Sequence, residues 1–329
     1  MTPGPGRLPR GRGRTLAAAC AALLPWPACA GAAAGTLWHD AFIREAVHGL
    51  RVSELSGAPT RVLNRVETGV PVPDGSHYLT WEYERREDVS TLSLFTRAGA
   101  LLRRVRLDGY VRRVRPSPLR VDEVLVLWSP TAGGVESVRR EWRLLDLAAA
   151  SLVARYPGVD AAADWLPDGR VLHLAADGAI RIGTPALDVR PAGRLAVAGR
   201  VVGRLWVDRA GARIITSWQQ RWPDGGVRST DLWISALDGR GVQRLTDTGR
   251  TSSAVWSPDG QAFAFDVDPA SVCTTTGCSG GMSGGCDLYW APATVRGVTP
   301  SSAGVQRFKV TERDGRRGTL GCDLLGWTP

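Results

Sequence analysis

The chain has 329 residues, of which 43% are hydrophobic and 22% charged, so it is neither disordered nor fibrous but globular. This length allows one large domain or two ordinary ones. The formal net charge is +9, carried by arginine apart from the single lysine, Lys309. We interpret this near-exclusive use of arginine as coding bias rather than as a designed anion-binding face.

Residues 1–30 have the features of a signal peptide: several arginines, a short apolar run at residues 15–24, and Ala28-Cys29-Ala30 before Gly31 as a cleavage site. The apolar run is shorter than the roughly 20 residues that span a bilayer. We therefore expect export to the periplasm or the medium, without a membrane-spanning segment. Removing this segment, with its four arginines and no acidic residue, lowers the net charge from +9 to +5. Nucleic acid is not an expected partner of such an exported, mildly basic protein.

After the signal, residues 31–48 are expected to be a lead-in, either one short helix or irregular. Short segments with alternating apolar and polar residues then begin near Leu50 and continue to the end of the chain. Alternation bounded by Gly, Pro and Asp predicts half-buried β-strands. Equivalent positions recur every 41–51 residues and then, after an insertion at residues 269–286, once more near the end: Pro71, Val114, Trp165, Trp206, Trp256 and Trp327.

The clearest unit is residues 231–268, with strands at 232–237, 242–246 and 262–267. In Trp256-Ser-Pro-Asp-Gly260, Pro presets φ and Gly accepts positive φ, so the chain can reverse tightly. This unit resembles the repeat of TolB-like β-propellers, the PD40 or WD40-like repeat, and a four-stranded blade has about 40–45 residues. The resemblance implies an all-β fold, a six-bladed TolB-like propeller over residues 49–329.

The two ends of this domain are incomplete units. Residues 50–57 and 60–63 match the last two strands of a blade, and residues 321–329 stop where a turn would begin. An open ring would expose apolar faces, so we expect the last blade to be shared between C-terminal strands near residues 320–329 and N-terminal strands near residues 45–66.

Four cysteines remain after signal removal, and in an oxidising compartment they predict two disulfides: Cys273, Cys278, Cys286 and Cys322. Cys322 lies on the predicted closing strand, so we expect one bridge from it to the insertion and one local bridge within the insertion. Cys273-x4-Cys278 also loosely resembles half a zinc knuckle.

The sequence shows no catalytic, cofactor-binding or metal-binding constellation. The Pro-Asp-Gly motifs are interpreted as turns and the tryptophans as core residues. Two Gly-x-Ser-x-Gly matches, at residues 277–281 and 281–285, lack the strand, the helix and the later histidine that a nucleophile elbow needs.

Arginines gather at the junction of the first two units, which could be a solvated strand edge or a docking patch for an anionic partner. The residues of the proposed patch are Arg103, Arg104, Arg106, Arg112, Arg113 and Arg115, with Arg120 following.

We expect an exported, non-catalytic and monomeric scaffold without a cofactor, which binds a protein or an envelope polymer through the loops of the propeller. Two alternatives stay open: an enzyme, a hydrolase or lyase with a metal-assisted site in the central channel, or a secreted glycan-binding protein. TolB itself carries a further α/β domain before its propeller, and we expect no such domain between Gly31 and Leu50. The resemblance alone therefore does not imply a role in the Tol–Pal envelope system, which stays open.

Overall fold

The structure is a computed structural model. It describes residues 34–42, 48–55, 61–64, 69–132, 135–136, 139–157, 162–184, 189–268, 272–274, 277–279, 286–308 and 323–329. Within these ranges the chain forms strands and no helix, so they contain no apolar helix of membrane-spanning length. All of these described residues belong to one compact unit, residues 33–329.

Six four-stranded antiparallel sheets form the blades of the fold, each written here from its innermost to its outermost strand. Blade 1 consists of β4 (Gly69–Pro71), β5 (His77–Glu84), β6 (Val89–Thr96) and β7 (Leu101–Asp108). Blade 2 consists of β8 (Tyr110–Pro116), β9 (Glu123–Ser129), β12 (Glu141–Asp146) and β13 (Ser151–Pro157). Blade 3 consists of β14 (Ala162–Trp165), β15 (Val171–Leu174), β16 (Ala179–Gly183) and β17 (Val189–Arg194).

Blade 4 consists of β18 (Val201–Val207), β19 (Arg213–Arg221), β20 (Val227–Ala236) and β21 (Gln243–Arg244). Blade 5 consists of β22 (Ala254–Trp256), β23 (Ala262–Val267), β26 (Asp287–Pro292) and β27 (Gln306–Arg307). The closing blade is β28 (Leu324–Thr328), β1 (Thr36–Phe42), β2 (His48–Glu54) and β3 (Arg61–Asn64). Two small hairpins form separate two-stranded sheets: β10 (Thr131–Ala132) with β11 (Val135–Glu136), and β24 (Val272–Thr274) with β25 (Gly277–Ser279).

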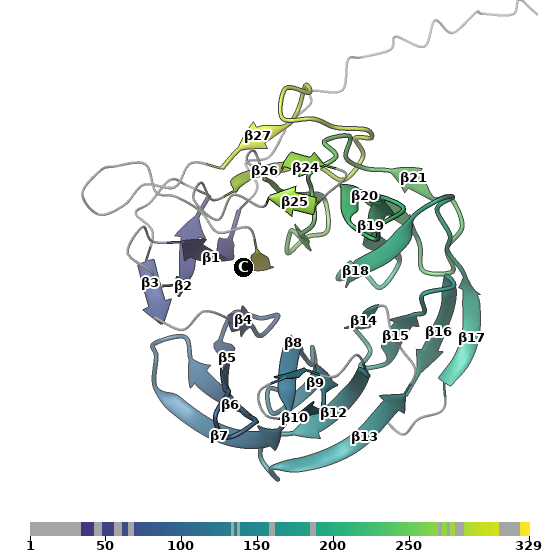
Figure 1. Cartoon of the computed structure of the whole chain (residues 1–329). Helices are drawn as coiled ribbons and strands as arrows, with labels where there is room; N and C mark the ends of the chain where they lie inside the picture. The colour runs from purple at the N-terminus through teal and green to yellow at the C-terminus, as the bar shows by residue number, and fades with distance from the viewer. Residues whose placement is uncertain are drawn as a thin grey trace, which may run out of the picture. The chain divides into compact units, whose positions relative to one another are not determined.

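The blades form a closed ring (Figure 1). Each innermost strand contacts the innermost strands of both neighbouring blades, in the cyclic order β28, β4, β8, β14, β18, β22 and back to β28. These six strands surround the central channel. The predicted all-β, six-bladed propeller is confirmed.

The ring is closed by pairing between the two ends of the unit. Leu37 lies opposite Trp327 and Thr36 opposite Thr328, and the Trp38 indole nitrogen donates to the Thr328 hydroxyl at 2.9 Å. The closing blade therefore takes one strand from the C-terminal side and three from the N-terminal side, which confirms the predicted shared blade.

The expected lead-in at residues 31–48 is corrected by the structure. Its residues 36–42 form β1, the second strand of the closing blade, rather than a short helix or an irregular segment. Side chains that alternate along a strand point to opposite faces, and here both faces are buried: Leu37 packs with the blade 5 side and Trp38 with Tyr78. Burial on both faces removes the alternation in polarity that sequence analysis relies on.

Apolar contacts between successive blades make up the core. On β23, Phe263 and Phe265 pack with blade 4 residues such as Trp206, whereas Ala262 and Ala264 pack toward the closing blade with Trp327. This division follows from the two-residue period of a strand. Each blade is therefore a wedge whose stability depends on both neighbours.

The tryptophans of the repeat connect adjacent innermost strands as well as filling the core. The Trp165 indole nitrogen donates to the Arg115 carbonyl at 2.8 Å, and that of Trp256 donates to the Trp206 carbonyl at 3.1 Å. Both side chains are buried.

The Pro-Asp-Gly motifs close tight turns, as the sequence predicts. Asp259 accepts hydrogen bonds from the Gln261 backbone at 2.9 Å and the Ser257 hydroxyl at 2.6 Å, and Gly260 has φ +69°. Asp259 therefore caps its turn through hydrogen bonds to the residues around it.

Candidate binding site in the central channel

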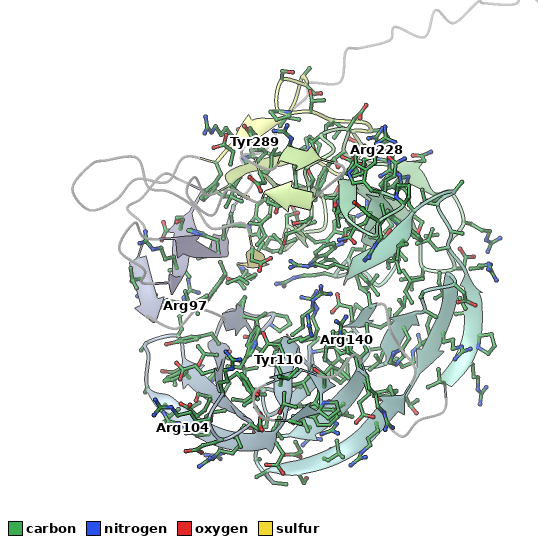
Figure 2. All side chains as sticks on the ribbon, viewed as in Figure 1. Arg97, Arg104, Tyr110, Arg140, Arg228 and Tyr289 are labelled. Atoms are coloured by element: carbon green, nitrogen blue, oxygen red, sulfur yellow. The ribbon has the colours of Figure 1, made fainter. Side chains whose placement is uncertain are left out.

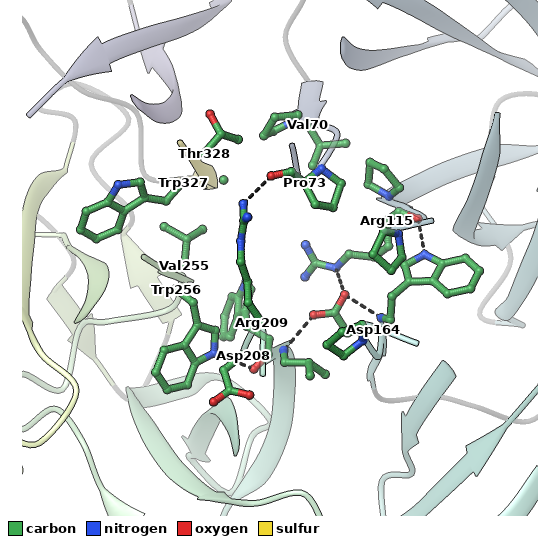
Figure 3. A pocket seen from close by; sticks show the side chains of 18 of the residues that line it. Val70, Pro73, Arg115, Asp164, Asp208, Arg209, Val255, Trp256, Trp327 and Thr328 are labelled. Carbon is green, nitrogen blue, oxygen red and sulfur yellow. Dashed lines mark hydrogen bonds and ion pairs between the residues drawn. The ribbon is translucent and has the colours of Figure 1, made fainter. Parts of the chain in front are cut away.

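The candidate site is a cavity at one mouth of the central channel, with a volume of about 410 Å³ (Figure 3). All six innermost strands and the turns that follow several of them contribute to its walls. The C-terminal ends of these strands meet there because each blade starts in the same direction along the channel. The site therefore exists only when the ring is closed.

The rim of this mouth is mainly apolar and rigid. Five prolines from three blades line it together with four tryptophans: Pro71, Pro73, Pro116, Pro118, Pro167, Trp165, Trp206, Trp256 and Trp327. Proline has a fixed φ and no amide hydrogen, so these segments offer a preformed apolar surface with few backbone donors. Such a concave surface with a few polar groups suits an extended ligand.

A small set of charged side chains reaches into the mouth. Arg115 on β8 points into the cavity with its Nε 3.8 Å from a carboxylate oxygen of Asp164 on β14 (Figure 3). Asp164 accepts hydrogen bonds from the Trp165 and Val207 backbone amides, both at 3.0 Å. Burial raises the pKa of Asp164, although Arg115 and these amides oppose the shift.

Arg209 lies across the mouth. It belongs to the turn after β18 of blade 4 and donates to the carbonyl of Pro73, in the turn after β4 of blade 1 (Figure 3). Burial lowers its pKa, while Asp74 acts in the opposite direction. A ligand that enters the mouth must pack against this side chain or displace it.

Beyond the mouth the channel narrows to a second pocket of about 90 Å³, here called the neck. Val70, Arg115, Trp206 and Leu325 line both spaces, so the two are continuous. Among the described residues, the charged side chains of the neck are four arginines and one aspartate: Arg112, Arg113, Arg115, Arg204 and Asp323.

Two of these arginines reach the same strand of blade 4. Arg113 donates to the Gly203 carbonyl at 3.3 Å and Arg115 to the Leu205 carbonyl at 3.4 Å. Arg204 pairs with Asp323 at 2.5 Å. Burial first, and then the neighbouring charges of Arg204 and Arg115, lower the pKa of Arg113 to about 9. Burial alone would raise the pKa of Asp323, but Arg204 and the other arginines hold it below its usual value.

The structure divides the arginine patch that the sequence predicts. Arg103, Arg104 and Arg106 lie on β7, the outermost strand of blade 1, whereas Arg112, Arg113 and Arg115 lie on β8, the innermost strand of blade 2. Arg104 and Arg106 line a separate pocket with Glu82, Glu84 and Glu87, and Arg106 pairs with Glu87 (Figure 2 labels Arg104). The six arginines are therefore not one docking surface. Arg120, beyond the patch, pairs with Asp146 at 3.1 Å.

The cysteines are only partly described. Cys286 is buried and disulfide-bonded. The side chains of Cys273 and Cys278, and all of Cys322, lie outside the described residues, so the predicted pairing stays a prediction. Within the described ranges, no three His, Cys, Asp or Glu side chains gather in a way that could hold a metal ion.

Sequence reasoning missed Asp164, Arg204, Arg209 and Asp323 as channel residues. Three of them lie next to a tryptophan of the repeat in the sequence. Asp164 immediately precedes Trp165, Arg204 lies two residues before Trp206, and Arg209 lies three residues after it. Aligning the residues around each repeat tryptophan would have placed them near the channel. Asp323 lies just before β28 and carries no such marker.

Comparison with solved structures agrees with this architecture. TolB from Acinetobacter baumannii superposes with a TM-score of 0.60 at 14% identity, over 89% of this chain and 67% of that one. The fold is that of a TolB-like six-bladed β-propeller.

Two further solved structures match at lower TM-scores. The β-propeller domain of the trilobed protease from Pyrococcus furiosus has a TM-score of 0.50 at 12% identity, over 84% of this chain and 80% of that one. That domain is described as having an open velcro topology, whereas here β28 pairs with β1. An acylaminoacyl peptidase matches with a TM-score of 0.50 at 10% identity, over 80% of this chain and 46% of that one.

Sequence comparison adds no family assignment: no family model matches the chain, and no curated protein matches it. The likenesses above concern the fold alone.

Proposed function

We propose that this protein is an exported, non-catalytic binding scaffold that holds an extended segment of a partner protein in the mouth of its channel. The observation that carries the proposal is the mouth itself, a preformed cavity of about 410 Å³ with a proline- and tryptophan-rich rim. Rigid aromatic and proline surfaces bind extended chains at a low entropic cost, because little of the site must be ordered on binding. Export is inferred from the composition of residues 1–30.

A photo-crosslinking experiment in cells tests this proposal. A photoreactive residue is introduced at Leu119, an exposed position next to Pro118 of the rim, and in a matched control at Val153, an exposed position on the outer strand β13. We expect one discrete crosslinked partner from position 119 and none from position 153. Equal crosslinking from both positions, or none from position 119, would contradict binding through the mouth.

Two further measurements address export and the enzymatic alternative. N-terminal sequencing of the mature protein should find cleavage near Ala30, and an intact Met1 in the cytoplasmic fraction would contradict export. Elemental analysis of the purified protein should find no stoichiometric calcium or zinc. One metal ion per chain would instead favour a metal-assisted enzyme.

A further inference from the structure

The neck is short of negative charge. Arg204 is neutralised by Asp323. The buried Nε of Arg115 lies 3.8 Å from a carboxylate oxygen of Asp164 and has no hydrogen-bond partner. Arg113 makes one hydrogen bond to described residues, 3.3 Å long and to a neutral carbonyl, and no described carboxylate lies within ion-pair distance of it. Positive charge in the neck therefore exceeds what the described carboxylates neutralise.

Such an arrangement is costly without an anion. A guanidinium offers five N–H donors in a planar fork, and Arg113 uses one of them within the described residues. Burial and the adjacent arginines disfavour its charged form and outweigh the opposite effect of Asp323, as its lowered pKa indicates. A bound anion would reverse this effect, since an opposite charge close by stabilises the guanidinium.

The dimensions of the neck restrict which anion could bind. Its volume of about 90 Å³ admits one small anionic group but no sugar or nucleotide. Apolar side chains complete its walls, among them Val70, Trp81 and Leu324. Because the surroundings are apolar, the attraction between an anion and the arginines is stronger than in water.

We propose that the neck is a carboxylate-binding site, in which Arg113 and Arg115 bind one carboxylate of the segment that occupies the mouth. This inference rests on the proposed function and specifies the chemistry of the partner. The carboxylate could be the C-terminus of the segment or an aspartate or glutamate side chain, because both present the same pair of oxygens. Arg204 contributes charge but stays paired with Asp323.

The site is tested first with acetate and formate as probes. Trp81 and Trp206 line the neck, so tryptophan fluorescence is measured while either anion replaces chloride at constant ionic strength. We expect a saturable change in the wild type and in the control Arg103→Gln, whose side chain is exposed on β7. In Arg113→Gln the apparent affinity should fall about tenfold or more, as expected for one lost charge-assisted hydrogen bond. No saturable change in the wild type, or an unchanged affinity in Arg113→Gln, would overturn the site.

A measurement on the unmodified protein guards against misfolding of the variant. Crystals of the wild type grown with sodium formate should show formate between Arg113 and Arg115. A neck without formate at saturating concentration would overturn the proposal.

Peptide mixtures then separate the two sources of the carboxylate and the two proposals. Immobilised wild-type protein is offered three mixtures of random heptapeptides. The first mixture has no acidic residues and a free C-terminus, and the second is the same mixture with an amidated C-terminus. The third is amidated and contains one aspartate in each peptide. Preferential retention of the first supports a C-terminal carboxylate, and of the third a side-chain carboxylate. Equal retention of all three overturns the carboxylate site but keeps the mouth as a binding surface. Retention of none overturns the proposed function, and with it the proposal that the carboxylate belongs to a bound peptide.

Discussion

At the scale of single residues, His173 is a buried group that makes folding depend on pH. Its ring is almost fully buried on β15, packs on Tyr156 with centroids 4.6 Å apart, and has no hydrogen bond at either nitrogen. Burial, with a smaller effect from Arg181, lowers its pKa to about 4. The folded state thus keeps the ring neutral at pH values at which the unfolded chain binds a proton.

The stability that depends on neutral His173 is complete above pH about 6.5 and is lost as the pH falls toward 4. His173→Phe keeps the packed ring and cannot be protonated. We expect this variant to match the wild type at pH 7.5 and to exceed it by up to about 3 kcal/mol at pH 4.5, from 1.36 kcal/mol per unit of pKa. Urea unfolding at both pH values measures this, and an equal difference at the two values would contradict it.

Asp266 on β23 has the opposite effect. Its carboxylate is buried and accepts hydrogen bonds from the amides of Ser252 at 2.9 Å and Ser253 at 2.8 Å. Burial raises its pKa to about 7 even though these amides favour the ionised form. A raised pKa means that the folded state binds a proton that the unfolded chain releases, so its contribution to stability is largest below pH about 4 and is lost as the pH rises through 7.

Asp266→Asn should therefore change stability most at high pH. In the His173→Phe background, where His173 no longer contributes, we expect the Asn variant to gain at least about 1 kcal/mol relative to Asp between pH 5 and pH 8.5. Unfolding curves in urea at these two values supply the comparison. The Ser252 hydroxyl also donates to Asp266, at 3.1 Å. A relative loss at pH 8.5 would show that this hydroxyl and the two amides outweigh the cost of burial.

The sequence predicted the roles of individual turn residues better than those of channel residues. Asp259 and Gly260 act locally, through hydrogen bonds to residues two or three positions away, so a short motif suffices to interpret them. Arg115 and Asp164 meet only because two blades lie side by side in the ring. The predicted arginine patch is divided in the structure for the same reason. Its residues run from the outermost strand of one blade to the innermost strand of the next, so arginines close in sequence do not share one surface.

At the scale of elements, the hairpin β24–β25 favours one connectivity of the cysteines. Its register places Cys273 directly opposite Cys278, one position beyond the pair Thr274–Gly277 that flanks the two-residue loop. The pair next to such a loop is hydrogen-bonded, so Cys273 and Cys278 form a non-hydrogen-bonded pair, with Cα atoms about 4.5 Å apart. This separation lies within the range that a disulfide spans.

We therefore predict disulfides Cys273–Cys278 and Cys286–Cys322, in keeping with the expected tie between the insertion and the closing strand. The second would close a loop of about 35 residues and stabilise by roughly 3–4 kcal/mol on the chain-entropy estimate. Mass mapping of the non-reduced protein should identify both bridges. Finding Cys322 joined to Cys273 or Cys278 would contradict the prediction, and free thiols at all four would also contradict export.

The alternation of apolar and polar residues predicted some strands of the fold but not others. The strand at residues 262–267, which follows the Ser-Pro-Asp-Gly turn, was predicted with the bounds that β23 has in the structure. β1 was missed because Leu37 and Trp38 are buried on opposite faces, which removes the alternation. β17 carries no clear pattern for another reason: its residues are mostly exposed, and Pro191 and Gly193 interrupt the strand.

At the scale of the whole molecule, stability depends on β28. This strand pairs with β1, contacts the innermost strands β4 and β22, and buries Leu324 and Trp327. Its Gly326 passes so close to Pro71 that a Cβ there would lie 2.3 Å from the proline ring. Without β28, the faces of two blades would be exposed to water.

Deletion of residues 324–329 should therefore unfold or aggregate the protein, because the net stability of a domain is only about 5–15 kcal/mol. The matched point variant Thr328→Val removes the 2.9 Å hydrogen bond from Trp38 but keeps the strand. It leaves the buried indole N–H without its partner, so it should cost about 1–3 kcal/mol. Thermal unfolding by circular dichroism distinguishes the two. A truncated protein with an unchanged melting temperature would contradict ring closure by β28.

The pairing of β28 with β1 also has a consequence for how the chain folds. The two partners of the Trp38–Thr328 hydrogen bond are 290 residues apart, so this contact has one of the largest loop-closure entropies in the chain. Contacts between residues distant in sequence slow folding, whereas each of the other five blades is built from a continuous stretch. Those blades can form early, while β1 keeps an unpaired inner edge until β28 docks. The slowest folding phase should therefore be the docking of this strand, and the species that precedes it, with an open ring and no mouth, should be the one most prone to aggregation.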